Sequence, residues 1–341
     1  MAHNLGDQFM YSEHKRKPVI RTQWCLPLIK ELSNKLQRKL NYIGLPGIDA
    51  LDIKSWIESL DNVIAFQCSE YKAGRVKKTI DVRILDDYFN DMERKSKLKS
   101  GIVYEGFVED IVMGRPSDRG EIFDQVDFMN LYNLDFCNSL TTPRNIHDER
   151  GKLISYHKLE VINELLNYQN IAFEKNKSCA KFIMFLTINA NSFNADTSLI
   201  KEKEYSDYFK KIKKINHKEV VAVRNLKAYC HYNLSKIFKE NGFLADFFPP
   251  IFYFGSSYPN QHRGGRAEFH RMMTFTILGT KIKNQDELIS QNVAEFLSEA
   301  FLFANDQKLK CFKDKFIDEN EFSSVPDVLL KRTSTYKKYW S

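Results

Sequence analysis

The chain has 341 residues and a mass of 40.0 kDa, with 43% hydrophobic and 13% aromatic residues. This composition suffices for a large buried core and excludes an intrinsically disordered chain. The 14 glycines and 9 prolines exclude collagen-like and low-complexity sequences. A formal net charge of +7 allows a polyanionic partner but does not require one.

Targeting and cysteine patterns favour a cytoplasmic protein that does not associate with a membrane. The longest apolar run, 182–188, is too short to cross a bilayer, and the first 18 residues lack the apolar core of a secretory signal. No two of the six cysteines lie within forty residues of each other, so zinc spacings are absent and reduced thiols are expected. The histidines are also scattered, and we expect no metal site.

The predicted elements begin with a polar arm, residues 1–20, followed by a lead-in helix at 24–40 whose leucines recur at helical spacing. From residue 42 onward, short apolar runs alternate with segments of helical period, which is typical of a parallel α/β sheet. The expected strands of this series are 42–47, 62–68, 102–113, 125–136 and 181–190. The expected helices between them lie at 48–60, within 69–99, and at 147–176.

The end of the chain departs from this alternation. Residues 201–242 predict a helix that is basic in its first half, and the strands predicted at 247–255 and 270–281 are too close for a helix between them. They therefore predict an antiparallel pair. Residues 287–304 predict a last helix before a basic, aromatic tail.

We expect an α/β fold with a mostly parallel seven-stranded sheet, helices on both faces and a terminal antiparallel hairpin. The expected organisation is an arm with its lead-in helix at 1–40, one α/β domain at 41–282, and a helical C-terminal extension with a basic tail at 283–341.

The segment 42–47, Tyr-Ile-Gly-Leu-Pro-Gly, ends the first predicted strand with two glycines. Glycines let a backbone approach a ligand closely, and the following helix offers unpaired N–H groups. Asp49 and Asp52 follow and could bind an ammonium group. A tight turn between strand and helix explains the same residues without a ligand.

Polar residues also follow the next predicted strands. The second strand ends in Gln67, with Glu70 nearby, and the third leads into Glu109 and Asp110. These carboxylates suit either a ligand amine or a charged surface turn.

The fourth predicted strand runs from an apolar stretch directly into Asn133, Asp135, Cys137 and Asn138. Polar groups in an apolar context require partners. A ligand is one such partner, and the backbone at the start of the next helix is the other; the position at a strand end favours the ligand.

The order of five strand–helix units and a terminal antiparallel pair resembles the class I S-adenosylmethionine-dependent methyltransferases over about residues 40–282. In that family the seventh strand is inserted antiparallel beside the fifth. The resemblance implies S-adenosylmethionine as cofactor, with its methionine part at Gly44, Leu45, Pro46 and Gly47. It further implies ribose contacts from Gln67 and an adenine amine held by Glu109 or Asp110.

The sequence departs from the family pattern at two of these points. The loop has two glycines rather than three, and Tyr42 stands where an acid is common. Gln67 replaces the acid that usually binds the ribose, so the charge-assisted hydrogen bond is lost.

The resemblance also implies that the end of the fourth strand faces the transferable methyl group. There, amino-methyltransferases carry an Asp/Asn-Pro-Pro-aromatic motif, which residues 133–138 replace without the prolines. We predict that Asp135 holds an amine acceptor and that Asn133 or Asn138 orients it. A buried structural thiol is favoured over a nucleophile for Cys137.

The substrate predicted by this interpretation is a nucleic acid. Residues 201–218 combine seven lysines and three acids with aromatic side chains, which suits a phosphate backbone and stacked bases. In the loop 255–266, Tyr258, Arg263 and Arg266 are candidates for substrate or phosphate contacts. A solvated helix face and an ordinary hairpin loop explain the same residues.

Two other interpretations stay open. The first is a catalytically degenerate methyltransferase-like subunit that binds nucleic acid or protein, which the altered loop and Gln67 favour. The second is a nucleotide- or NAD-binding protein of another kind, against which the missing Gly-x-Gly-x-x-Gly pattern argues. A partner protein could dock on the N-terminal arm or the C-terminal extension.

Overall fold

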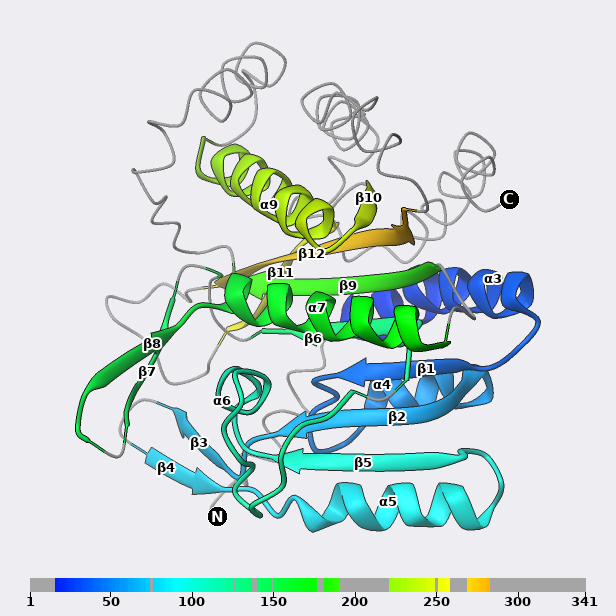
Figure 1. The fold of residues 1–341 in the computed structure, drawn as a ribbon, viewed down its shortest axis with the longest axis horizontal. Coiled ribbons are helices and arrows are strands. Elements are labelled where there is room, and N and C mark those ends of the chain that lie inside the picture. Colours follow the sequence, from blue (N-terminus) through cyan, green and yellow to red (C-terminus); the bar gives the residue numbers. More distant parts are fainter. Residues whose placement is uncertain are drawn as a thin grey trace.

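The computed structural model describes residues 16–73, 76–125, 127–136, 140, 142–148, 150–176, 181–189, 221–248, 251–257 and 269–282. Within these ranges the main sheet has eight strands (Figure 1). They are β1 (Leu40–Gly44), β2 (Leu60–Gln67), β5 (Ser100–Glu105), β6 (Leu131–Asp135), β9 (Lys181–Asn189), β10 (Phe243–Phe247), β11 (Ile251–Ser257) and β12 (Phe269–Lys281).

The strand order in the sheet is β10-β12-β9-β6-β1-β2-β5, and β11 pairs with another part of β12. Strands β5, β2, β1, β6 and β9 run parallel to one another. Strand β12 runs antiparallel to β9, β10 and β11. The last strand is therefore inserted in reverse beside the fifth strand of the parallel series, and the predicted fold class is confirmed.

Helices cover both faces of the sheet, which explains why the central strands are apolar almost throughout. One face packs against α3 (Leu26–Leu36), α4 (Leu51–Trp56) and α5 (Arg83–Arg94). The other packs against α6 (Val108–Val112), α7 (Lys158–Asn176) and α9 (Val221–Glu240). In Figure 1, α7 lies in front of the sheet, with α3 and α4 behind it.

The lead-in helix differs from its predicted bounds. A short helix α2 (Arg16–Val19) and a π-helical segment η1 (Ile20–Cys25) precede α3, and Pro27 lies in the first turn of α3, a position where proline is tolerated. The helix ends at Leu36 because Gln37 adopts a left-handed conformation with φ of 52°. Leu40, predicted as helical, begins β1.

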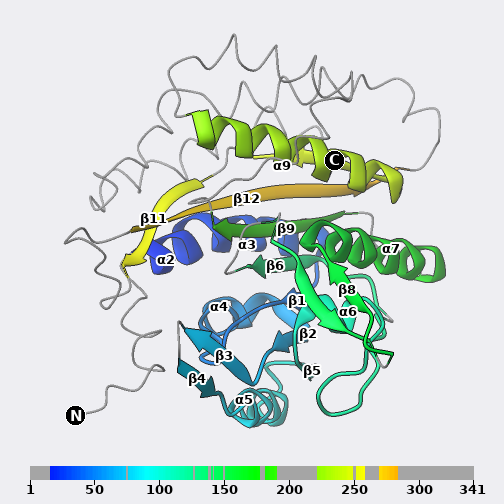
Figure 2. The ribbon, with the colours of Figure 1, turned by 90° about the vertical axis from the view of Figure 1, so that its left-hand side faces the viewer.

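Two antiparallel hairpins were absent from the predicted elements. Strands β3 (Glu70–Ala73) and β4 (Val76–Thr79) precede α5, where only helix was expected. Strands β7 (Arg144–His147) and β8 (Leu153–Tyr156) precede α7, within a segment partly predicted as helix. Both hairpins lie beyond the carboxyl ends of the parallel strands (Figures 1 and 2).

Three predicted strands also have different bounds. The strand expected at 102–113 ends at Glu105, and α6 follows it after a turn at Gly106. The strand expected at 125–136 is confined to β6. The strand expected at 247–255 is divided between β10 and β11, which pair with different parts of the long β12.

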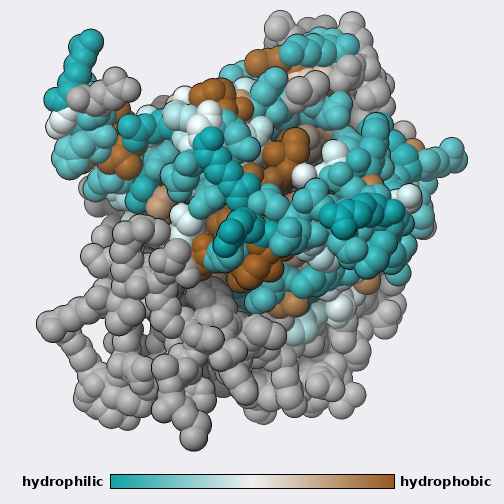
Figure 3. All heavy atoms as spheres, turned by 90° about the horizontal axis from the view of Figure 1, so that it is seen from below, coloured by the Kyte–Doolittle hydropathy of each residue, from teal (hydrophilic) through white to brown (hydrophobic). Residues whose placement is uncertain are grey.

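The predicted helix at 287–304 and the basic segment 201–218 lie outside the described residues. In the described ranges, no helix combines the length and apolar character needed to cross a membrane. The surface on the α5 side is largely hydrophilic, with small hydrophobic areas (Figure 3).

Candidate functional site

The carboxyl end of β1 lies directly against that of β6. Gly44 is opposite Asn133 in the register, and the N–H of Leu45 donates to the carbonyl oxygen of Asn133 at 2.9 Å. A Cβ at position 44 would overlap that carbonyl oxygen and would lie 2.7 Å from the hydroxyl of Tyr42. Gly44 therefore permits this approach, and the chain turns away at Gly47, where φ is +67°.

Asn133 belongs to a buried polar cluster on the sheet face that packs against α3 and α4. Its Nδ2 donates to Oδ2 of Asp52 in α4 at 2.8 Å and lies 3.5 Å from the Tyr42 hydroxyl. Asp52 also forms an ion pair with Arg21 of the N-terminal segment. Burial raises the pKa of Tyr42 well above its ordinary value, and the negative charge of Asp52 raises it further. The cluster thus joins β1, β6, α4 and η1.

Asp135 ends β6 two residues beyond Asn133 and faces a cation. Nζ of Lys17 in α2 lies 2.7 Å from its Oδ2, and both side chains are partly exposed. The two predicted carboxylates nearest the β1 and β6 ends, Asp52 and Asp135, are thus each paired with a cation of the N-terminal segment.

That segment is fixed in place by two buried tryptophans. Nε1 of Trp24 donates to Oγ1 of Thr276 in β12 at 2.9 Å, and Nε1 of Trp56 donates to the carbonyl oxygen of Arg21 at 3.1 Å. Both indoles are almost completely buried, so their N–H groups require such partners. Lys17 and Arg21 are therefore presented to the strand ends by a well-packed element.

Gln67 ends β2 and is opposite Glu105, the last residue of β5. Its side-chain amide donates to the backbone carbonyl oxygen of Cys68 at 3.0 Å. The backbone carbonyl oxygen of Gln67 accepts from the N–H of Gly106 at 3.0 Å. The side chain of Gln67 is half-buried at the predicted ribose position.

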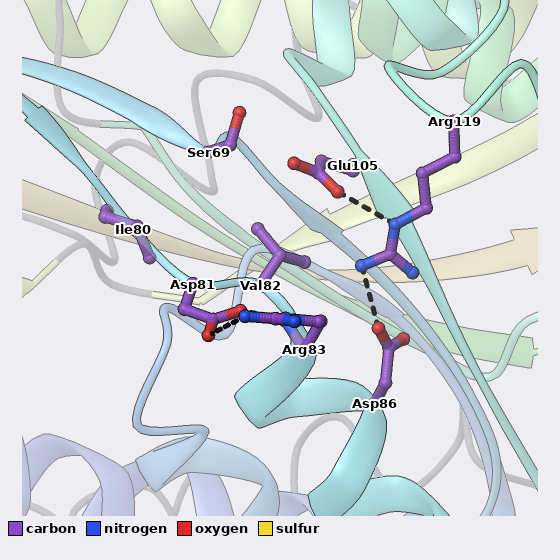
Figure 4. A pocket seen from close by; sticks show the side chains of 8 residues that line it. All are labelled: Ser69, Ile80, Asp81, Val82, Arg83, Asp86, Glu105 and Arg119. Carbon is purple, nitrogen blue, oxygen red and sulfur yellow. Dashed lines mark hydrogen bonds and ion pairs between the residues drawn. The ribbon is translucent and has the colours of Figure 1, made fainter.

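A cleft of about 750 Å³ lies on the α5 side of these strand ends. Arg119 spans it and pairs with Glu105 at 2.8 Å and with Asp86 of α5 at 2.7 Å (Figure 4). A second pair, Asp81 with Arg83, lies at the start of α5. The remaining lining residues are Ser69, Ile80 and Val82.

The two carboxylates after β5 have different surroundings. Glu109 is buried, and its Oε1 lies 3.7 Å from Nζ of the buried Lys158. Oδ2 of Asp110 accepts from Arg144 of β7 at 3.2 Å. Oδ1 of Asp110 is buried and has no hydrogen-bond partner among the described residues. An unpaired buried carboxylate oxygen costs about 1–3 kcal/mol, so Asp110 is the better candidate for accepting a ligand N–H.

Lys158 lies at the first turn of α7 and points to the loop after β6. Its Nζ donates to the carbonyl oxygen of Thr142 at 3.0 Å and lies 5.6 Å from the ring centroid of Phe136. A buried lysine thus connects the loop after β6 with Glu109 after β5.

The structure brings Gly44, Leu45 and Asn133 into direct contact and places Asp135 on the same strand. Gln67 ends β2, and Glu109 and Asp110 follow β5, at the same edge of the sheet. The predicted residues Asn138, Tyr258, Arg263 and Arg266 lie outside the described part of the chain, as does Cys137.

Sequence reasoning missed Lys17, Arg21, Arg144 and Lys158. Lys17 lies within the predicted polar arm 1–20, and nothing in the local sequence pairs these cations with carboxylates up to 118 residues away. Among the described residues, no three His, Cys, Asp or Glu side chains gather as a metal site.

Comparisons with known proteins supplement this geometry. A family model described as PP_RS20740-like matches residues 8–230. No curated protein matches the sequence.

Several solved structures are similar over about three quarters of this chain. They include a candidate RNA methyltransferase of Pyrococcus horikoshii (12% identity, 76% of this chain, 83% of that chain, TM-score 0.31). A candidate methyltransferase of Bacillus halodurans C-125 has 10% identity, with 75% and 99% covered and a TM-score of 0.33. Magnesium protoporphyrin IX methyltransferase of Synechocystis PCC 6803, with bound SAH, has 10% identity, with 75% and 84% covered and a TM-score of 0.31. The fold assignment rests on the strand order of the main sheet.

Proposed function

The chain belongs to the PP_RS20740-like family, and we propose that it is an S-adenosylmethionine-dependent methyltransferase that acts on an amino group of a nucleic acid. The observation that carries this proposal is the sheet, in which the reversed β12 lies between β9 and β10. This arrangement is the one that the resemblance to class I methyltransferases requires. Open α/β sheets bind ligands beyond the carboxyl ends of their strands, where the candidate residues lie.

The residues at this edge fit the proposed cofactor. The backbone of Gly44, Leu45, Pro46 and Gly47 would hold the methionine part, because the chain turns at Gly47 beyond β1 and open space surrounds the position that a side chain would take there. Gln67 would bind the ribose hydroxyls, since its amide can donate and accept hydrogen bonds. When bound, S-adenosylmethionine supplies an electrophilic methyl group on a sulfonium.

Asp110 is the proposed acceptor for the adenine amine. Glu109 already faces the ammonium of Lys158, whereas Oδ1 of Asp110 has no partner among the described residues. An amino N–H donated to this oxygen would remove the cost of leaving it unpaired.

Asp135 is the proposed binding group for the acceptor amine. Its carboxylate already binds the ammonium of Lys17 at 2.7 Å, which supports its suitability for a cationic or amino ligand. An acceptor would displace Lys17 from Oδ2 or use Oδ1. Asn133, and Asn138 outside the described residues, would orient the acceptor. Such a reaction needs positioning and exclusion of water more than it needs a strong base.

The proposal of a nucleic-acid substrate rests on sequence composition. The lysines and aromatic residues of 201–218, together with Tyr258, Arg263 and Arg266, would contact phosphates and bases. A partner protein on the N-terminal arm or the C-terminal extension remains part of the proposal.

A titration followed by a transfer assay tests the proposed function. Calorimetry with S-adenosylmethionine and S-adenosylhomocysteine should detect binding, and transfer of a labelled methyl group to bulk RNA or DNA should follow. Asp135→Asn should abolish transfer and leave cofactor binding unchanged. Asp127→Asn serves as the control, because Asp127 is exposed and precedes the opposite end of β6. Absence of cofactor binding would reject the proposal, and normal turnover in Asp135→Asn would reject the role of Asp135.

One observation favours a second candidate, a methyltransferase-like subunit without turnover. The ribose position carries the amide of Gln67, which already donates to the carbonyl oxygen of Cys68, instead of a carboxylate. Binding of S-adenosylhomocysteine to the wild-type protein without transfer to RNA, DNA or a co-purified protein would favour this candidate.

A further inference from the structure

Arg144 lies where the hairpin β7–β8 meets the segment that follows β5. It is the first residue of β7 and is opposite Tyr156 of β8. Its Cζ lies 3.6 Å from the ring centroid of Phe107. Nη2 and Nε lie 3.2 Å and 3.4 Å from Oδ2 of Asp110. The stacked ring restricts motion perpendicular to the guanidinium plane, and the carboxylate restricts rotation within it.

The two oxygens of Asp110 therefore have different surroundings. Oδ2 accepts both hydrogen bonds from Arg144, whereas Oδ1 is buried without a partner among the described residues. Because Arg144 binds Oδ2, the carboxylate cannot rotate freely to bring Oδ1 to a hydrogen-bond donor of the protein. Oδ1 is thus fixed in one direction as an acceptor for a ligand.

We propose that Arg144 is a positioning residue that orients Asp110 so that the site selects a purine with a 6-amino group over one with a 6-oxo group. The inference rests on the proposed function, because it assigns Asp110 to the adenine of the cofactor. It adds a residue on a separate element, the hairpin β7–β8, to the recognition of that base.

The selectivity follows from the charge states of the pair. A guanidinium stays protonated at all working pH values, and its partner Asp110 is acceptor-only when ionised. A 6-amino group donates to such an oxygen, whereas a 6-oxo group brings a second acceptor against it. Arg144 secures the preference by occupying Oδ2 and leaving Oδ1 as the oxygen that faces the ligand.

The probes for calorimetry are S-adenosylhomocysteine, whose purine has a 6-amino group, and S-inosylhomocysteine, whose purine has a 6-oxo group. The wild-type protein should bind the adenosyl compound at least about tenfold more tightly, as expected for one hydrogen bond to a charged group. In Arg144→Gln the ratio should fall below about threefold, and Arg144→Lys should restore it in part because charge without the stacked fork fixes Asp110 less well. Arg150→Gln is the matched control, since Arg150 is an exposed residue of the same hairpin.

A second variant tests the orientation of the side chain at position 110 through the preference between the two probes. In Asp110→Asn, Arg144 should hold the side-chain oxygen of the amide and leave its NH₂ group in place of Oδ1. The preference should then invert in favour of S-inosylhomocysteine. The inversion should disappear in Asp110→Asn combined with Arg144→Gln, because the amide is then free to rotate. A merely structural role of Arg144 would weaken both probes equally and would produce no inversion.

The outcomes separate this inference from the proposed function. If the wild-type protein binds neither probe, the proposed function fails and this inference fails with it. If it binds S-adenosylhomocysteine but shows no preference, or if Arg144→Gln keeps the wild-type ratio while folded by circular dichroism, the inference alone is overturned. Should Arg144→Gln fail to fold, Asp110→Asn decides: an inverted preference supports the inference, and an unchanged one overturns it.

Discussion

Gly44 occupies a position where no side chain fits. Its hydrogens face the backbone of Asn133 and the hydroxyl of Tyr42, and a Cβ would overlap the Asn133 carbonyl oxygen. Because both neighbours belong to buried strands, neither can yield without disturbing the β1–β6 ladder. The glycine thus serves the sheet itself, independently of any ligand.

Gly44→Ala should therefore lower the free energy of unfolding by about 1–3 kcal/mol through overpacking. Urea unfolding followed by circular dichroism measures this change. Gly47→Ala is the comparison, because a Cβ there meets nothing within 4 Å and only the positive φ opposes it. Equal stability of Gly44→Ala and the wild type would show that β1 and β6 are less closely apposed than described.

Two buried thiols give a second test at the residue scale. Cys25 and Cys230 are buried, and burial raises the pKa of each thiol well above its ordinary value. Because the thiolate is the reactive form, both should resist iodoacetamide at pH 8 in the native protein and react in urea. Mass spectrometry of tryptic peptides resolves each site. Rapid native labelling of Cys230 would contradict its place on the buried side of α9.

Among the elements that the structure describes, the N-terminal segment pairs Arg21 with Asp52 and Lys17 with Asp135, and the two pairs differ in burial. The side chains of Arg21 and Asp52 are 9% and 19% exposed, whereas those of Lys17 and Asp135 are 40% and 24% exposed. Exposed pairs contribute little because water and salt screen them, while breaking a pair with buried members leaves a charge poorly compensated. The pair of Arg21 should therefore anchor the segment, and the pair of Lys17 should not.

Arg21→Met should lower the free energy of unfolding by about 1.5–3 kcal/mol, the range for a hydrogen bond to a charged group. Lys17→Met should change it by about 1 kcal/mol or less. Urea unfolding of both variants, with Asp52→Asn to complete a double-mutant cycle for Arg21, measures the coupling. A larger loss in Lys17→Met than in Arg21→Met would contradict the assignment of the anchor.

The two hairpins show why some elements escaped prediction. Strands β7 and β8 have four residues each and alternate between half-buried and exposed positions, with the apolar Leu153 of β8 among the exposed ones. Strands of four residues are too short to show the hydrophobic period on which sequence assignment depends. The hairpin β3–β4 has the same length and a lysine-rich second strand. In both hairpins each strand pairs only with its partner, outside the main sheet.

At the scale of the whole molecule, the sheet was predictable because its central strands are buried on both faces. The continuous apolar runs of β2, β6 and β9 identify parallel strands, and the short connection before β12 identifies the antiparallel one. The sixth strand was misplaced because β10 and β11 lie close in sequence and pair with the same long strand.

The candidate site was predictable only along the strands. Parallel strands run in the same direction, so their carboxyl ends lie at one edge of the sheet. The contact of Gly44 with Asn133 therefore follows from the order of the strands alone. The partners Lys17, Arg21 and Arg144 come from elements whose packing depends on distant residues, such as Trp24 against Thr276. No local pattern encodes contacts of that range.

Buried thiol and phenol groups lie on both sides of the sheet, so the dependence of stability on alkaline pH is a property of the whole molecule. Burial raises the pKa values of Tyr42, Tyr132, Cys25 and Cys230, the first and third with a further contribution from Asp52. In the unfolded chain these groups release protons near their ordinary values, about 9 for cysteine and 10 for tyrosine. Above pH 9 the native state therefore binds more protons than the unfolded state, and stability must fall as pH rises.

The fall should reach at most about 1.4 kcal/mol per pH unit for each fully buried group. Lys281 acts in the opposite direction, because desolvation lowers its pKa and stability then rises with pH as the unfolded lysine retains its proton longer. Urea unfolding at pH 7.5, 9.0, 10.0 and 10.5 measures the balance of these effects. We expect it to be negative, because burial also raises the pKa values of Cys68, Tyr88, Tyr104 and Tyr168. In Tyr132→Phe the loss above pH 10 should be smaller than in the wild type, whereas the loss between pH 9 and 10, which comes from the thiols, should persist. Equal slopes above pH 10 would mean that the hydroxyl of Tyr132 ionises in the native protein as readily as in the unfolded chain, which its complete burial between the sheet and α7 opposes.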